Sequence, residues 1–237
     1  GATVGLAGVN LRTAGAGAHA VRITAGAPST VVIDGSTLST QDTRADIIRA
    51  DGGAADVTIK NGSNINTAGN LLNLQSSGGV GSVVKLVADG VNIKGNLISD
   101  SASTGRVFLQ NGTTLTGMID PMSMAVDGTS AWNVTADSDL TSLTLNGGTV
   151  NFLTPAGNAF KTIVTGSLDG TAGLLSMNTK LGGSASPTDL LHVTGNAGGA
   201  HFVRIANAGG RGARTRGDGI RVVQIDGASP ADNFKLI

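Results

Sequence analysis

The stretch DGSTLST at residues 34–40 returns as NGSNINT at 61–67, DGVNIKG at 89–95, NGTTLTG at 111–117 and NGGTVNF at 146–152. A degenerate copy, DGTSAWN, begins at Asp127, and successive copies start 27, 28, 22, 16 and 19 residues apart. Each Asx-Gly pair joins two apolar runs, because glycine permits the positive φ of a tight corner. A recurring corner of this kind indicates a repeat architecture.

The apolar residues around each corner fall at fixed offsets. We expect two sets to point inward: one four residues into a copy and one two residues before it. The first set is Leu38, Ile65, Ile93, Leu115 and Val150, and the second is Val32, Ile59, Val87 and Leu109. Candidates for a third strand that closes each coil are Ile47-Ile48, Leu71 to Leu74 and Leu97-Ile98.

Ordinary antiparallel hairpins in a β-sandwich are the alternative, since Asx-Gly between apolar runs is also a hairpin signal. A meander needs a turn about every 8–12 residues without a larger period. Here one particular corner returns at 16–28 residues, which is the length of a solenoid coil. The spacing therefore predicts an all-β fold, a right-handed parallel β-helix.

Composition supports this fold. Glycine accounts for 37 of 237 residues, aromatics for 3%, and all 16 acidic residues are aspartate, which favours turns over helices. The formal net charge is zero, so there is no electrostatic argument for nucleic acid as a partner. Cysteine is absent, which excludes disulfides and suits export through an oxidising compartment. No leader peptide or apolar membrane-spanning stretch is visible, and we interpret Gly1 as a fragment boundary.

The pattern changes from Trp132 onward, where alternation becomes clearer, and four of the five phenylalanines lie beyond residue 150. Over about 105 residues the sequence resembles the pertactin-like autochaperone region of bacterial autotransporters. The ordered landmarks are Trp132 to Val134, Ser142 to Leu145, Gly147 to Phe152, Phe160 to Ile163, Leu168 to Gly170, Gly173 to Thr179, Asp189 to Leu191, Val193 to Gly195, His201 to Ile205, Asn207, Gly209, Gly219-Ile220, Val222-Val223 and Phe234 to Leu236.

This resemblance implies a passenger carried across the outer membrane by a C-terminal β-barrel and located at the bacterial cell surface. It also implies that the C-terminal segment folds first and templates the other coils. We therefore expect passenger coils over residues 1–130, and further coils with an autochaperone-like cap over 131–237. The expected core of that cap is Trp132, Leu143, Leu145, Val150, Phe152, Phe160, Phe202 and Phe234.

Catalytic and metal-binding patterns are not found in the sequence. The GxSxG elbow and the GGxGxD calcium repeat do not occur, and we interpret His19, His192 and His201 as structural or solvent-facing. A polysaccharide lyase with Asp34 and Asp89 on one side of the helix is a remote alternative, since turn formation explains both residues. We expect no cofactor and no enzymatic activity from this chain alone.

Arg216-Gly217-Asp218 spells the tripeptide that integrins bind, in a glycine-rich stretch predicted to be a loop. The alternative is a solvated turn with no ligand. Two functions remain. The first is an adhesin or aggregation rod whose Thr, Ser and Asn face binds another copy of the chain, a host surface, a matrix component, a glycan or another bacterial cell. The second is a stalk for an enzymatic or toxic head upstream. Further repeats upstream would favour the adhesin, and a protease or lipase signature there would favour the stalk.

Overall fold

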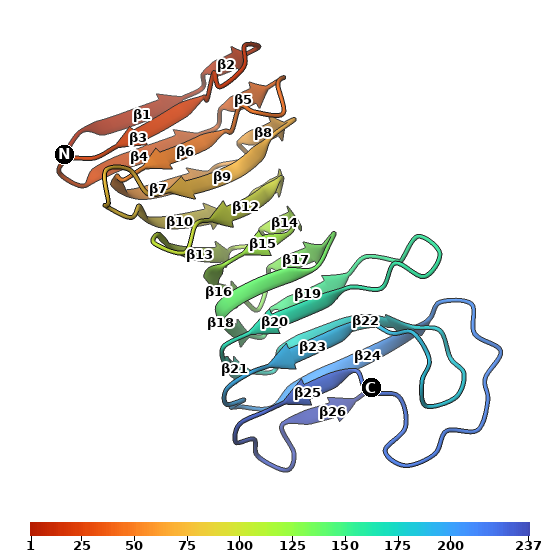
Figure 1. The fold of residues 1–237 in the computed structure, drawn as a ribbon. Helices are drawn as coiled ribbons and strands as arrows, with labels where there is room; N and C mark the ends of the chain where they lie inside the picture. The colour runs from red at the N-terminus through yellow and green to blue at the C-terminus, as the bar shows by residue number, and fades with distance from the viewer.

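A computed structural model describes all 237 residues and consists of strands without helices (Figure 1). Three sheets run along the rod, and their strands pair in parallel with strands one coil away. The first sheet contains β1 (Thr3–Ala7), β4 (Ser29–Asp34), β7 (Ala54–Lys60), β10 (Val83–Asp89), β13 (Thr104–Gln110), β16 (Met122–Asp127), β18 (Ser138–Asn146), β20 (Thr162–Thr165), β21 (Leu168–Thr171), β23 (Leu190–Val193) and β25 (Val223–Ile225).

The second and third sheets complete the coils. The second contains β2 (Asn10–Thr13), β5 (Thr37–Thr40), β8 (Asn64–Thr67), β11 (Asn92–Lys94), β14 (Thr114–Gly117), β17 (Ala131–Val134), β19 (Thr149–Phe152), β22 (Leu174–Thr179), β24 (His201–Asn207) and β26 (Phe234–Leu236). The third contains β3 (Val21–Thr24), β6 (Ile48–Asp51), β9 (Asn70–Gln75), β12 (Asn96–Ser99) and β15 (Ile119–Asp120). This topology confirms the predicted parallel β-helix and its third strand.

The core is a set of aliphatic columns, because alternation along each strand sends every second side chain inward and parallel stacking places equivalent side chains above one another. The predicted column from the second sheet forms as expected, and the degenerate copy joins it through Trp132. Its members in order are Leu11, Leu38, Ile65, Ile93, Leu115, Trp132, Val150, Leu175 and Val203.

The inward set predicted for the first sheet was wrong at Val32 and Val87. The strand register places Ile33, Ile59 and Ala88 side by side, so Val32 and Val87 face outward and are half-buried. The prediction counted positions from each Asx-Gly pair as if every corner had the same number of residues, but some corners contain one residue more than others. A one-residue difference moves a strand residue to the opposite face.

The two kinds of corner explain this difference. In the Asp-Gly copies aspartate ends the strand and only glycine is left-handed, with φ of 52° at Gly35. In two of the Asn-Gly copies the asparagine is left-handed as well, with φ of 54° at Asn61 and 57° at Asn111, whereas Asn146 ends β18 as the aspartates end their strands. Asparagine tolerates this conformation better than most residues, so it can add one residue to the corner.

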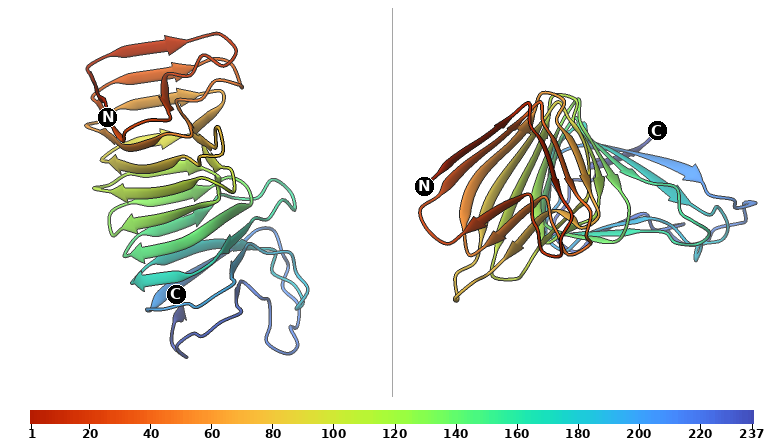
Figure 2. Two further views of the ribbon diagram at one scale, coloured as in Figure 1. Left: turned by 60° about the vertical axis from the view of Figure 1, so that its left-hand side comes forward. Right: turned by 90° about the horizontal axis from the view of Figure 1, so that it is seen from above.

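The third sheet ends at β15, and the following coils have two sheets and longer loops (Figure 2). The first two sheets continue without interruption past residue 130. In the first sheet β18 pairs with β16 and β20, and in the second sheet β17 pairs with β14 and β19. The predicted boundary between residues 1–130 and 131–237 is therefore not a break in the sheets. That the two parts differ in folding behaviour stays a prediction.

Candidate binding face and folding segment

The outward residues of the second sheet form a polar face along the rod. Its two columns consist of Thr, Ser, Asn and a few basic residues: Asn10, Thr37, Asn64, Asn92 and Thr114 in one, and Arg12, Ser39, Asn66, Lys94, Thr116, Asn133, Asn151 and Ser176 in the other. The Asn151 amide donates to Asn133 Oδ1 at 3.0 Å, and the Asn133 amide donates to Thr116 Oγ1 at 3.2 Å. These side chains present regularly spaced donors and acceptors to solvent.

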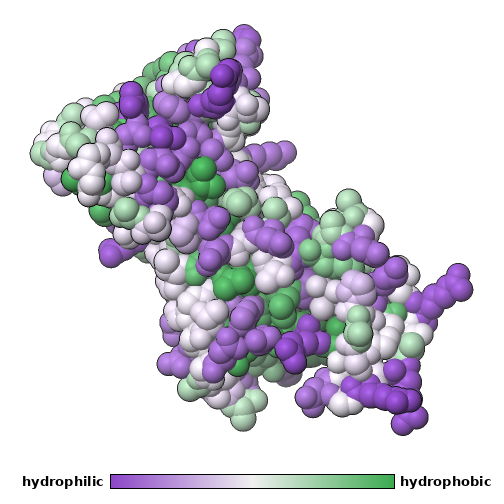
Figure 3. Space-filling view, in the orientation of Figure 1, coloured by the Kyte–Doolittle hydropathy of each residue, from purple (hydrophilic) through white to green (hydrophobic).

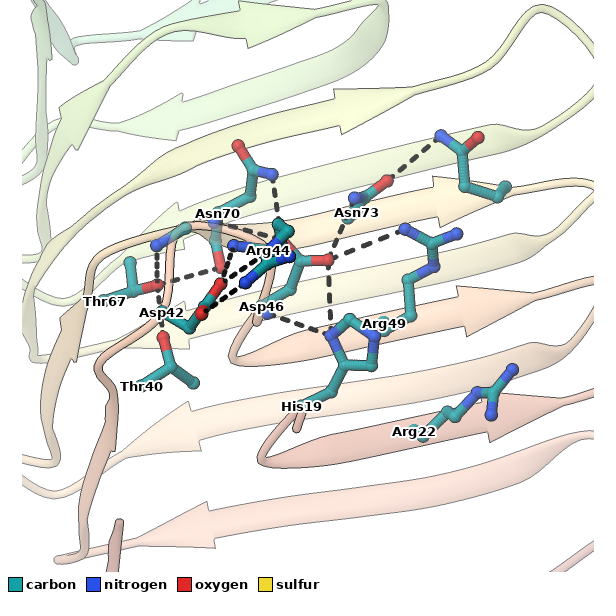
Figure 4. A network of polar contacts seen from close by, with 12 residues as sticks. His19, Arg22, Thr40, Asp42, Arg44, Asp46, Arg49, Thr67, Asn70 and Asn73 are labelled. Atoms are coloured by element: carbon teal, nitrogen blue, oxygen red, sulfur yellow. Dashed lines mark hydrogen bonds and ion pairs between the residues drawn. The ribbon is translucent and has the colours of Figure 1, made fainter. Parts of the chain in front are cut away.

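A buried polar network lies between the second and third sheets of the N-terminal coils (Figure 4). Asp46 is 2% exposed; its Oδ1 accepts from the Asn70 backbone and side-chain amides, and its Oδ2 accepts from Asn73 Nδ2 at 2.9 Å. His19 Nδ1 accepts from the Asp46 backbone amide at 2.9 Å. The geometry gives His19 a structural role, as the sequence indicated.

A second buried network lies in the C-terminal coils, where sequence reasoning missed it. Asp189 is fully buried, and its carboxylate accepts from the backbone amides of Lys161 at 2.8 Å and Asn178 at 2.7 Å, and from Asn178 Nδ2 at 2.7 Å. Lys161, also buried, donates from Nζ to Leu153 O. The network ties β22 to the loop that precedes β20 and to the loop that precedes β23. No local sequence pattern distinguishes Asp189 from a turn aspartate.

Only some residues of the predicted cap core are buried. Trp132, Leu143, Leu145, Val150 and Phe152 are buried, whereas Phe160 and Phe234 are half-buried. Phe202 was wrongly expected in the core: it is 36% exposed, because alternation along β24 turns His201 and Val203 inward instead. The role of these residues in folding stays a prediction.

His201 is buried in the last coils, with 1% of its surface exposed. Its Nε2 lies 3.0 Å from Gly198 O, its Nδ1 has no partner, and its ring centroid is 5.9 Å from that of Phe234. Burial lowers the pKa of His201, outweighing the opposing hydrogen bond to Gly198 and the nearby charge of Asp169. The ring is therefore held neutral in the folded chain.

This arrangement predicts acid sensitivity of the C-terminal coils. The folded pKa of His201 is lower than the unfolded one, so the unfolded chain binds more protons and stability falls as pH drops below about 6.5. We expect the urea midpoint of these coils to decrease between pH 7 and 5, and His201→Gln to flatten that slope. The matched control is His192→Gln, on the outer face. An unchanged slope in His201→Gln would contradict the assignment.

His192 belongs to a surface cluster on the first sheet. Its Nε2 lies 2.8 Å from Asp226 Oδ2, and Gln224 Nε2 donates to Asp226 Oδ1 at 2.9 Å. Hydrogen bonds from Gln224 and His192 lower the pKa of Asp226. Neither a nucleophile nor a third metal-ligating group completes this cluster.

Asp34 and Asp89 lie at corners of successive Asp-Gly copies, and the structure shows what they contact. Asp34 accepts from Asn61 Nδ2 at 2.6 Å and pairs with Lys60 at 3.3 Å, and Asp89 accepts from Asn111 Nδ2 at 2.7 Å. The hydrogen bond from Asn61, with Lys60 contributing, lowers the pKa of Asp34 despite partial desolvation. Both carboxylates thus crosslink neighbouring corners.

The Arg216-Gly217-Asp218 tripeptide lies in an exposed loop between β24 and β25. Ser184 fixes the backbone of Arg216, since its Oγ accepts from Arg216 N and donates to Arg216 O, each at 2.7 Å. Asp218 lines an open hollow of about 950 Å³ at the end of the rod, with Val203, Phe234 and Leu236 among the other lining residues. In Figure 3 polar residues cover much of these C-terminal loops, while apolar surface gathers over the middle coils.

The chain has no helix long and apolar enough to cross a membrane.

Residues 138–237 match the family model described as Autochaperone Domain Type 1. The chain is 37% identical over 163 residues to the autotransporter adhesin/invasin TibA of Escherichia coli O78:H11, covering 63% of this chain and 16% of TibA.

Two further relatives show the same kind of similarity. The BrkA autotransporter of Bordetella pertussis is 36% identical over 152 residues, covering 64% of this chain and 14% of BrkA. The autotransporter CRAC of Citrobacter rodentium is 39% identical over 113 residues, covering 43% of this chain and 7% of CRAC. The chain thus spans about a sixth or less of the length of these relatives.

Proposed function

Because the chain is the C-terminal region of an autotransporter passenger, with an autochaperone domain over residues 138–237, we propose that residues 131–237 fold first and template the coils of residues 1–130. The protein acts at the bacterial cell surface, reached through the outer membrane. The template region is the part of the chain that would form a stable edge for the next strands.

The buried aromatic side chains support this order of folding. Trp132 and Phe152 lie fully or almost fully inside the coils where residues 131–237 begin, and Asp189 binds two loops together further along. The N-terminal coils rely on Val, Ile and Leu columns and bury no aromatic ring. In a solenoid each coil contacts only its neighbours, so one robust end lowers the nucleation barrier for the rest.

Refolding order tests this proposal, since Trp132 is the only tryptophan and the chain has no cysteine. A dye on Thr30→Cys, on the exposed outer side of β4, would report N-terminal coil formation, and a dye on Thr171→Cys would report the C-terminal region. In stopped-flow refolding we expect the Trp132 and residue 171 signals to change together and the residue 30 signal to follow. If the residue 30 signal changes first, the template lies elsewhere.

The polar face supports a second role, adhesion, which the similarity to TibA, an adhesin/invasin, also favours. Its rows of amide and hydroxyl groups repeat at about 4.8 Å, so a repetitive partner, on a host cell, in the matrix or on another bacterium, can make many weak contacts at once. The three relatives are named as autotransporters, and one of them also as an adhesin. For this chain we therefore propose a binding role rather than a catalytic one.

Lysine substitutions on the polar face test the adhesive role. Asn64→Lys with Asn66→Lys adds two bulky charges to exposed positions of β8 without touching the core. We expect at least a tenfold loss of binding of the chain to cultured epithelial cells or to cells displaying the same passenger. Thr24→Lys on the third sheet with Ser101→Lys in an exposed turn is the matched control. Equal binding by both pairs of variants would contradict a role for this face.

A further inference from the structure

The outer face of the first sheet, here called the lateral face, differs in chemistry from the polar face. Its central column is largely apolar, half-buried and in register over five coils: Val32, Thr58, Val87, Phe108 and Ala125. Lys85 lies over the Phe108 ring, with Nζ 5.6 Å from the ring centroid. A central apolar strip with polar margins is the usual anatomy of a protein–protein interface.

Charged columns flank this strip at two residues on either side, about 6.6 Å along the strand. One margin contains Thr30, Asp56, Lys85, Arg106 and Ser123, and the other contains Asp34, Lys60, Asp89, Gln110 and Asp127. Two neighbouring coils carry a charge on both margins, with opposite signs that reverse from one coil to the next: Asp56 stands across from Lys60, and Lys85 from Asp89. The other three coils carry a charge on one margin only. No coil carries like charges on both margins.

We propose that the lateral face binds a second copy of this chain, related by a two-fold axis parallel to the rod. This rotation keeps each coil level with its equivalent and exchanges the two margins. Asp56 then faces Lys60 of the second copy, and Lys85 faces Asp89 of the second copy. The apolar column meets itself along the axis, as an isologous interface requires.

Charge complementarity selects this partner. Thr30 would face Asp34, Arg106 would face Gln110, and Ser123 would face Asp127, so like charges meet in none of the five coils. Asp56 and Arg106 have no ion-pair partner within the chain, and the Lys60–Asp34 pair is about one-third exposed on each side. Two parallel rods joined in this way would stand on the same cell surface, which goes beyond adhesion through the polar face.

Sedimentation equilibrium of the full chain at low salt tests the interface. We expect a reversible dimer that weakens as salt rises, and Asp56→Lys, which places two lysines opposite each other across the interface, should raise the dimer Kd by about tenfold or more. The double variant Asp56→Lys/Lys60→Asp should restore the dimer. Because that swap puts like charges beside Lys85 and Asp34 within one chain, recovery can arise only across the interface.

A second swap fixes the orientation. Asp56→Lys/Lys85→Asp places like charges opposite each other in the proposed parallel dimer, so this variant should stay monomeric. In a dimer of antiparallel rods, residue 56 of one copy would face residue 85 of the other, and the same swap would restore the ion pair. Thermal melting monitors the fold of each variant. The Asn64→Lys/Asn66→Lys variant, which changes the polar face and not the lateral face, should dimerise normally while losing adhesion. A native chain that is monomeric at all concentrations, an Asp56→Lys variant that dimerises like the native chain, or rescue by the Lys85 swap would overturn the proposal.

Discussion

Trp132→Ala is expected to lower the free energy of unfolding of the C-terminal coils by about 3–5 kcal/mol, the usual loss for an aromatic ring removed from a core. The ring is fully buried between Leu115 and Val150 of the neighbouring coils, and its Nε1 donates to Gly117 O at 2.9 Å. Truncation therefore leaves both a cavity and an unpaired buried carbonyl. Urea titration followed by circular dichroism measures the effect on each transition separately.

Phe202→Ala is the matched control for this prediction. It removes an aromatic side chain from the same second sheet, but the ring is on the outer face. We expect a change below about 1 kcal/mol, since surface substitutions rarely have larger effects. Equal losses in Trp132→Ala and Phe202→Ala would mean that Trp132 does not anchor this part of the core.

Asp189→Ala is the second substitution with a large expected effect. It leaves the backbone amides of Lys161 and Asn178 without an acceptor in a buried site, and each such loss costs about 1–3 kcal/mol. We expect a destabilisation of about 2–6 kcal/mol, with Asp189→Asn losing less because it keeps one acceptor oxygen. The urea midpoint of the C-terminal transition measures both.

Asp232→Ala, which removes an exposed carboxylate from the same region, controls for the change in net charge. It should leave the midpoint unchanged. If Asp189→Ala behaves like Asp232→Ala, then the buried network contributes nothing to the stability of the C-terminal coils, and its loops are held by other contacts.

The fold could be predicted from the sequence because one local feature, the Asx-Gly corner, is both visible and structurally decisive. Glycine has positive φ at every corner except Gly128 of the degenerate copy, and the residues four positions on, such as Leu38 and Ile65, stack as expected. The register of the first sheet could not be read in the same way. Whether an asparagine adds a residue to the corner depends on its own backbone conformation, which the letters Asp-Gly and Asn-Gly do not show directly.

The C-terminal contacts were less predictable for a related reason. An aspartate such as Asp189 resembles a turn residue in sequence, and its burial arises only when two loops close around it. Phe202 shows the reverse case, since an aromatic residue in a strand is expected inside, yet alternation from His201 places it outside. Resemblance to the autochaperone region supplied the order of these strands but not the side of the sheet that each residue faces.

Native-state hydrogen exchange in increasing urea tests the central claim, that residues 131–237 form the most stable part of the rod, more directly than proteolysis, which would also cut exposed loops. Amides of β17, β19, β22 and β24 belong to that part, and amides of β4, β7 and β8 to the N-terminal coils. We predict that the N-terminal amides exchange through an opening at lower urea, while the C-terminal ones exchange only on global unfolding. Exchange of the C-terminal amides first, with β4 to β8 still protected, would contradict the account.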